Sequence, residues 1–140
     1  KVTPDGSKYI ISAQYSDLID VYNTNGVLLK RISGPLNVYP KYSVKTLNNY
    51  PRLSHDKKDA ITGYMDIALT NDKIIALYSG IPLEQNEFDC KFLHVFSMKG
   101  ELLETVILDH KLVRITLDTP NNRLYGIQFS PIPEIYMYQL

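Results

Sequence analysis

A repeated hairpin pattern is the feature that most constrains how this chain can fold. Residues 2–14, 66–78 and 113–129 each contain a short strand-like run, a turn, and a more continuously apolar run. The turns are rich in Asp, Asn, Gly and Pro, which accept the backbone angles of a tight reversal. Ile67 and Ile115 occupy equivalent places and lie 48 residues apart, within the ~40–50 residues typical of such repeats. The sequence therefore predicts repeated units that each begin with a β-hairpin.

A second pair of strand-like runs follows each of the first two hairpins, at residues 18–32 and 92–107. After the third hairpin, residues 134–140 supply one further run. Repeated units of four short antiparallel strands are typical of β-propeller blades. We therefore predict an all-β fold, a β-propeller fragment of about three four-stranded antiparallel blades. The expected blades cover residues 1–35, 64–109 and 110–140 of one partial domain, with a long inserted loop at 36–63.

Three blades are too few to close a ring, and the outer blades are incomplete. The first lacks most of its innermost strand and the last lacks its outermost strand. We expect this chain to be a piece of a longer protein whose other blades complete the ring. Two copies around a shared axis are the other arrangement, because exposed sheet edges favour self-association.

Composition excludes several classes of partner. Lys and Arg number 15, as do Asp and Glu, so the chain lacks the basic excess typical of nucleic-acid binding. No run approaches the ~20 apolar residues of a transmembrane segment. Cys90 is the single cysteine, which excludes an internal disulfide.

The blade-forming residues resemble a known family. Residues 74–80 and 92–100, together with 117–127 and 134–138, are similar to TolB-like six-bladed β-propellers of Bacteroides-type bacteria. The resemblance implies about half of such a propeller, its C-terminal blades. It also implies an exported protein of the periplasm or cell envelope, often a lipoprotein with its anchor upstream. The family offers no catalytic motif to carry over.

The histidines and acids show no pattern typical of a metal or cofactor site. His55, His94 and His110 lack the spacing of metal ligands. The acidic loop containing Glu84, Glu87 and Asp89 is without the glycine turn and alternating oxygens that calcium prefers. Asn and Asp in the run 118–122 are explained by turn formation. We predict no cofactor.

Cys90 is a potential nucleophile only with a base beside it. His94 follows four residues later, and an even separation along a strand places two side chains on one face. Nothing in the sequence indicates an oxyanion hole, so a buried thiol is the favoured interpretation.

Five tyrosines are the candidate ligand-binding residues: Tyr39, Tyr42, Tyr50, Tyr64 and Tyr78. Aromatic faces at the mouth of a propeller can stack on sugar rings or peptide side chains. Large residues also fill the wedge-shaped gaps between blades, so packing is the other interpretation of the same tyrosines.

Two classes of function are open. The first is a non-enzymatic binding or scaffold propeller, exported and membrane-tethered, that recognises a protein or glycan. The second is a hydrolase or lyase with an acidic site in the central channel. Asp66 is the one acid well placed for such a site, and one acid cannot serve as both general acid and general base. The non-enzymatic function is therefore preferred.

Overall fold

The computed structural model describes residues 1–55, 60–85, 89–129 and 131–140. They form antiparallel sheets, and the helical segment among them is one 3-10 turn, η1 (Leu83–Gln85). The strands are β1 (Lys8–Ser12), β2 (Leu18–Asn23), β3 (Leu28–Ser33), β4 (Tyr42–Leu47), β5 (Tyr50–His55), β6 (Tyr64–Leu69), β7 (Lys73–Tyr78), β8 (Cys90–Ser97), β9 (Leu102–Leu112), β10 (Arg114–Asp118), β11 (Arg123–Gln128) and β12 (Glu134–Gln139). The prediction of an all-β propeller fragment is confirmed.

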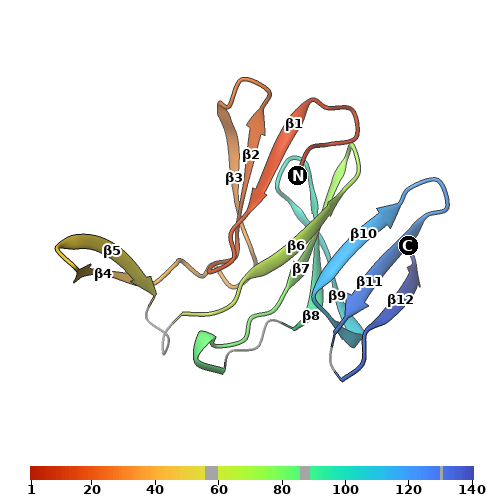
Figure 1. Ribbon diagram of the computed structural model, residues 1–140. Coiled ribbons are helices and arrows are strands. Elements are labelled where there is room, and N and C mark those ends of the chain that lie inside the picture. The colour runs from red at the N-terminus through yellow and green to blue at the C-terminus, as the bar shows by residue number, and fades with distance from the viewer. Residues whose placement is uncertain (56–59, 86–88, 130) are drawn as a thin grey trace.

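Three of the sheets have the meander order of propeller blades. Their strand orders are β1-β2-β3, β6-β7-β8-β9 and β10-β11-β12. In Figure 1 the three sheets lie next to one another in the order of the sequence. The first strand of the second sheet, β6, contacts both β1 and β10. The first strands of consecutive sheets therefore lie on the same side of the fragment.

Residues 1–3 extend the first sheet beyond β1. Val2 forms an antiparallel bridge with Tyr9, and the Ile10 N–H donates to the Lys1 carbonyl at 2.7 Å. The turn between them contains Gly6 at φ 72°, a left-handed conformation that glycine adopts without strain. Residues 1–3 therefore occupy the position in the first sheet that β6 occupies in the second sheet.

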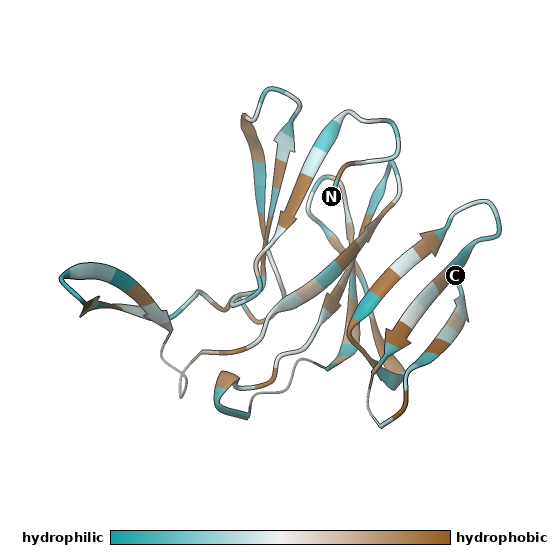
Figure 2. Cartoon of the chain, viewed as in Figure 1, coloured by the Kyte–Doolittle hydropathy of each residue, from teal (hydrophilic) through white to brown (hydrophobic). Residues whose placement is uncertain are grey.

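Alternation along the second sheet produces two apolar cores. Ile74, Ala76 and Tyr78 face the first sheet and pack with Ile10 and its neighbours. Ile75 and Leu77 point the other way, into a cluster shared with the third sheet. The period of two along a strand separates these sets, and Figure 2 shows hydrophobic positions interspersed with hydrophilic ones along the strands.

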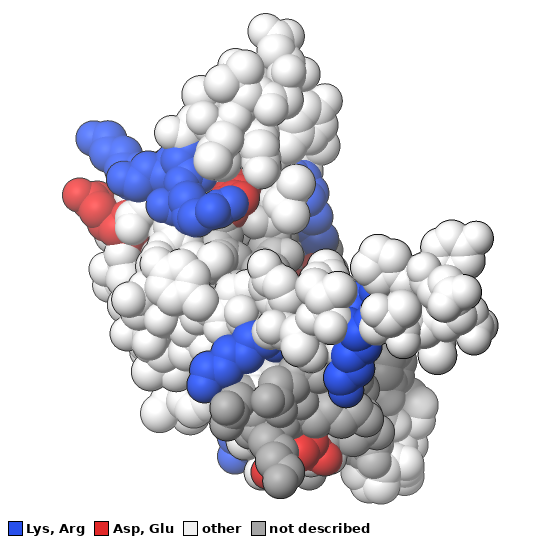
Figure 3. Space-filling model, turned by 90° about the vertical axis from the view of Figure 1, so that its left-hand side faces the viewer, with Lys and Arg blue, Asp and Glu red and all other residues white. Residues whose placement is uncertain are grey.

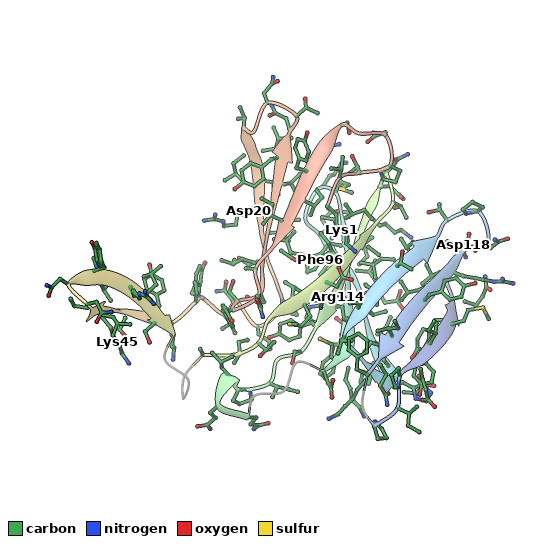
Figure 4. All side chains as sticks on the ribbon, viewed as in Figure 1. Lys1, Asp20, Lys45, Phe96, Arg114 and Asp118 are labelled. Carbon is green, nitrogen blue, oxygen red and sulfur yellow. The ribbon has the colours of Figure 1, made fainter. Side chains whose placement is uncertain are left out.

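Asp66 connects the inner strands of all three sheets. Its carboxylate accepts the Ile115 N–H at 2.9 Å and lies 2.8 Å from the Lys1 ammonium. Arg114 adds a hydrogen bond from its guanidinium to the Met65 carbonyl at 3.4 Å. Figure 4 labels Lys1 and Arg114 near β6 and β10. These contacts give Asp66 a structural role at the junction of the sheets.

The segment at 36–63, for which an inserted loop is expected, contains a hairpin of its own. Strands β4 and β5 pair with each other in a two-stranded sheet, and Figure 1 shows this hairpin apart from the three larger sheets. Asn48 and Asn49 form its turn with φ values of 52° and 63°. Two consecutive left-handed residues, for which Asn is favoured, are typical of a type I′ hairpin turn.

Candidate binding surface

The hairpin β4–β5, residues 42–55, is called the arm, and its two faces differ in chemistry. Residues directly opposite in an antiparallel pair share a face, so the pairing of Val44 with Leu53 and of Lys45 with Arg52 assigns the faces. The apolar face carries Tyr42, Val44, Thr46, Pro51 and Leu53. The basic face carries Ser43, Lys45, Leu47, Tyr50, Arg52 and Ser54.

The apolar face is open to solvent. Tyr42, Val44 and Leu53 are 58%, 66% and 69% exposed. Isolated apolar side chains on a surface are ordinary, whereas several on one unpartnered sheet face indicate a contact surface. The described residues place no other strand beside the arm.

The arm is also the basic part of a chain without net charge. Residues 36–55 contain Lys41, Lys45 and Arg52 and no Asp or Glu. Figure 3 views the side of the molecule that carries the arm, and Lys and Arg side chains there outnumber Asp and Glu. Figure 4 shows Lys45 on the arm, away from the three sheets. The electrostatic potential of the arm therefore favours an acidic ligand.

Asp17 holds the segment that leads into the arm. Its carboxylate accepts the Val38 N–H at 2.7 Å and the Leu36 N–H at 3.0 Å. The Gly34 N–H donates to the Asp17 carbonyl at 2.6 Å. Asp17 is fully buried, and a buried carboxylate is tolerated when hydrogen bonds replace its water. The entry to the arm is thereby fixed to the loop before β2.

The segment that leaves the arm returns to the same loop. The Gly63 N–H donates to the Gln14 carbonyl at 2.6 Å and the Tyr64 N–H donates to the Ala13 carbonyl at 3.1 Å. A Cβ atom at position 63 would lie 1.9 Å from the Ser16 carbonyl oxygen, so the approach requires glycine. Both ends of the arm segment are therefore held by residues 13–17.

Two of the five candidate tyrosines lie in the core between the first and second sheets. Tyr64 and Tyr78 are each 2% exposed. Tyr64 forms a 2.9 Å hydrogen bond with His94 Nδ1, and the Tyr78 ring stacks on the His94 ring with centroids 4.7 Å apart. The structure therefore places this pair in packing positions rather than on the surface.

Burial changes the acidity of this aromatic cluster. Desolvation raises the pKa of Tyr64 and raises the pKa of Tyr78 to about 12, because the charged phenolate loses its water. Burial also lowers the pKa of His94, and the nearby Asp17 partly offsets this change. His94 is therefore held neutral, as the partner of Tyr64 inside an apolar contact.

The other three candidate tyrosines are exposed. Tyr39, Tyr42 and Tyr50 are each more than half exposed. Tyr42 belongs to the apolar face and Tyr50 to the basic face, so the arm presents them in opposite directions. Tyr39 precedes β4. The five tyrosines therefore do not converge on one aromatic surface.

The expectation that Cys90 and His94 share a face is wrong. Cys90 packs with Leu77 and Leu93 toward the third sheet, whereas His94 contacts Tyr64 and Phe96 on the side of the first sheet. The register of β8 on β9 shifts between Cys90 and Phe92, and such a bulge breaks the alternation of faces. Burial also raises the pKa of the Cys90 thiol to about 12, which leaves it a poor nucleophile.

The acidic residues considered as possible cation ligands have structural partners or do not lie close to one another. Asp118 accepts the Asn121 side-chain amide at 2.7 Å, as expected for a turn. Asp89 lies 3.9 Å from the Lys111 ammonium and Glu84 is in η1, while Glu87 lies outside the described residues. Within the described part of the chain, no group of three or more His, Cys, Asp or Glu side chains is arranged to hold a metal ion.

Comparison with known proteins places the fold in a family. The family model described as TolB-like 6-blade propeller-like matches residues 4–120. The chain belongs to this family. No curated protein matches the chain. The match includes the first two sheets, the arm and β10, so the family assignment extends over the candidate binding surface.

Sequence reasoning missed two features of the candidate binding surface of this TolB-like chain. The arm was expected as a loop, although the alternation of Val44 and Leu53 with polar residues around Asn48–Asn49 is a hairpin signal. Asp17 had no comparable signal, because a Ser-Asp pair before a strand is typical of an ordinary turn.

Proposed function

We propose that this chain is part of a non-enzymatic binding or scaffold propeller and that the arm is its ligand-binding element. The observation that carries the proposal is an exposed apolar sheet face on a hairpin that lies between two segments, residues 34–38 and 63–64, both held by residues 13–17. A pre-organised surface loses less conformational entropy on binding. Long excursions on a rigid scaffold are also where binding residues concentrate.

The ligand class we propose is a protein, and the site residues are the exposed ones on and beside the arm. Tyr42, with Val44 and Leu53, supplies the apolar contact area, and the exposed Tyr39 lies just before it in the chain, while Tyr50 faces the other way. Tyr64 and Tyr78 are packed in the core between the first and second sheets, so the proposed contact surface does not include them. A glycan that stacks on Tyr39, Tyr42 or Tyr50 is the alternative ligand within the same proposal.

We further propose that the parent protein is exported and tethered at the cell envelope. The support is membership of the TolB-like family, which is typically periplasmic or envelope-associated. Among the described residues, no helix has the length and apolar character needed to cross a membrane. The tether in this proposal is a lipid anchor outside the present sequence.

Self-association is a separate proposal that rests on the outer faces of the terminal sheets. Ile11 on the first sheet and Ile135 and Met137 on the third are each more than half exposed. The same surfaces suit neighbouring blades of a larger ring. A hydrolase or lyase with an acidic channel has less support, because Asp66 is engaged by Lys1 and the Ile115 N–H.

Cross-linking and affinity capture from an envelope extract test the binding function. The wild-type chain is compared with Tyr42→Ser/Val44→Ser/Leu53→Ser, which removes the apolar side chains. Leu47→Ser/Tyr50→Ser on the opposite face is the matched control. We expect a protein that the wild type and the control capture and the first variant does not. Equal capture by all three proteins contradicts a role of the apolar face, and a glycan array applied to the same set tests the alternative ligand.

A further inference from the structure

The outer edge of β4 has backbone groups directed away from the arm. In a two-residue hairpin the residues flanking the turn, here Leu47 and Tyr50, exchange both backbone hydrogen bonds. Pairs alternate from that point, so Val44 and Leu53 form a pair without hydrogen bonds between them. The N–H and C=O groups of Tyr42, Val44 and Thr46 therefore point outward along β4.

The two edges of the arm differ in their capacity to accept another strand. Pro51 lies opposite Thr46 on β5, at an outward-facing position where proline has no N–H to offer. Proline at such a position protects a sheet edge from further pairing. Strand β4 contains no proline, and within the described residues its sheet has two strands. The β4 edge is therefore the one suited to strand addition.

The side chains beside this edge indicate what sequence an added strand needs. Tyr42, Val44 and Thr46 line the apolar face, whereas Ser43 and Lys45 line the basic face. Neighbouring strands place side chains of matching positions on the same face. An incoming strand therefore meets apolar groups with one set of alternate residues and cations with the other.

We propose that the β4 edge binds an extended segment of a partner protein, in which apolar and acidic residues alternate, by antiparallel strand addition. This inference rests on the proposed binding function of the arm. Backbone hydrogen bonds supply affinity in this mode and the alternate side chains supply specificity. The absence of Asp and Glu from residues 36–55 provides the charge complementarity for acidic residues in the segment.

The arrangement of the arm favours a protein strand over a membrane surface. The tip is the polar pair Asn48–Asn49, so insertion would bring amides into the lipid first. Insertion of the apolar face would also carry the outward N–H and C=O groups of Tyr42, Val44 and Thr46 into lipid without hydrogen-bond partners, which is costly.

A pair of proline variants separates edge binding from general contact with the arm. Val44→Pro and Leu53→Pro lie directly opposite each other, and each removes an apolar side chain and one outward N–H. The probe is a fluorescent peptide with six alternating Val and Glu residues, and anisotropy measures its affinity for the 140-residue chain. We expect Val44→Pro to weaken binding roughly tenfold or more, and Leu53→Pro, which leaves the β4 edge intact, to weaken it clearly less.

Changes in the probe test the same inference without altering the protein. In an antiparallel addition the Val residues lie opposite Tyr42, Val44 and Thr46, so the Val N–H groups face β4. N-methylation of the Val residues is expected to abolish binding, while N-methylation of the Glu residues preserves it. A peptide that alternates Val and Lys is expected to bind more weakly, because its cations face Lys45.

Several outcomes overturn strand addition at β4. These are no saturable binding of the Val/Glu peptide, equal effects of the two proline variants, or equal effects of the two methylations. Binding to phosphatidylglycerol vesicles without binding to the peptide identifies a membrane surface instead. If the apolar-face variant still loses its partner from the envelope extract, the binding function stands although the strand mechanism has failed.

Discussion

Replacing Asp17 with asparagine tests whether one buried carboxylate anchors the arm. The carboxylate accepts two backbone N–H groups, from Val38 at 2.7 Å and from Leu36 at 3.0 Å. In the Asp17→Asn variant the side chain retains one acceptor oxygen, but its amide nitrogen presents a donor to the second N–H. The variant therefore loses one charge-assisted hydrogen bond and leaves a backbone donor without an acceptor.

The expected cost follows from the burial of this contact. Asp17 has 0% exposure, so water does not replace the missing acceptor. Hydrogen bonds to charged groups contribute about 1.5–3 kcal/mol, and an unsatisfied buried donor costs a similar amount. We expect the free energy of unfolding to fall by about 2 kcal/mol. With a slope of ~1–3 kcal/mol per molar urea, the unfolding midpoint shifts down by about 1 M.

Asp20→Asn is the matched control in the neighbouring strand. Asp20 undergoes the same chemical change and accepts two hydrogen bonds from Arg31, both at 2.7 Å, and one from the Tyr22 hydroxyl at 3.2 Å. The Arg31 side chain is 56% exposed, and exposed ion pairs contribute little to stability. We therefore expect a much smaller shift of the urea midpoint for Asp20→Asn than for Asp17→Asn.

Urea unfolding is followed by far-ultraviolet circular dichroism, with hydrogen exchange at the Leu36 and Val38 amides as a local measurement. Faster exchange at these two amides is expected in Asp17→Asn and not in Asp20→Asn. Equal midpoint shifts in the two variants, or a loss below about 0.5 kcal/mol for Asp17→Asn, would refute the anchoring role, because bonds to a buried charge cost more than this to remove.

Two further predictions follow from buried titratable groups. Burial lowers the pKa of His94 from its ordinary 6.5, so the unfolded chain takes up a proton more readily; stability is therefore full above pH 6.5 and falls as the pH drops toward the folded-state pKa. Urea midpoints between pH 7.5 and 5 should fall more steeply for wild type than for His94→Gln, and parallel curves contradict this. Burial raises the pKa of Cys90 to about 12, so a disulfide reagent at pH 8 should react only as fast as the chain unfolds; an immediate reaction in the native state contradicts the burial.

Much of the fold could be predicted because local chemistry encodes it. Turn residues at 118–122 connect β10 and β11 as predicted, and those at 4–7 connect the bridge at Val2 to β1, since such residues tolerate tight reversals. The two-residue period of strands such as β7 explains how one sheet serves two cores. The 48-residue spacing of Ile67 and Ile115 indicated repeated units without knowledge of any contact.

The candidate site was less predictable, because the direction of a side chain depends on register. A one-residue shift reverses every face of a strand. The bulge after Cys90 separates it from His94, and pairing across Asn48–Asn49 places Tyr42 and Tyr50 on opposite faces. Neither arrangement follows from sequence separation.

Residue types and their spacing were sufficient for the strands, the turns and the repeated unit, since these depend on neighbours within a few residues. The three-dimensional fold was required for the burial of Tyr64, the anchoring by Asp17 and the junction at Asp66. Each of these depends on residues far apart in the chain: Tyr64 on His94, Asp17 on Val38, and Asp66 on Ile115. Such contacts form only when whole sheets pack, so their energies are properties of the assembled blades.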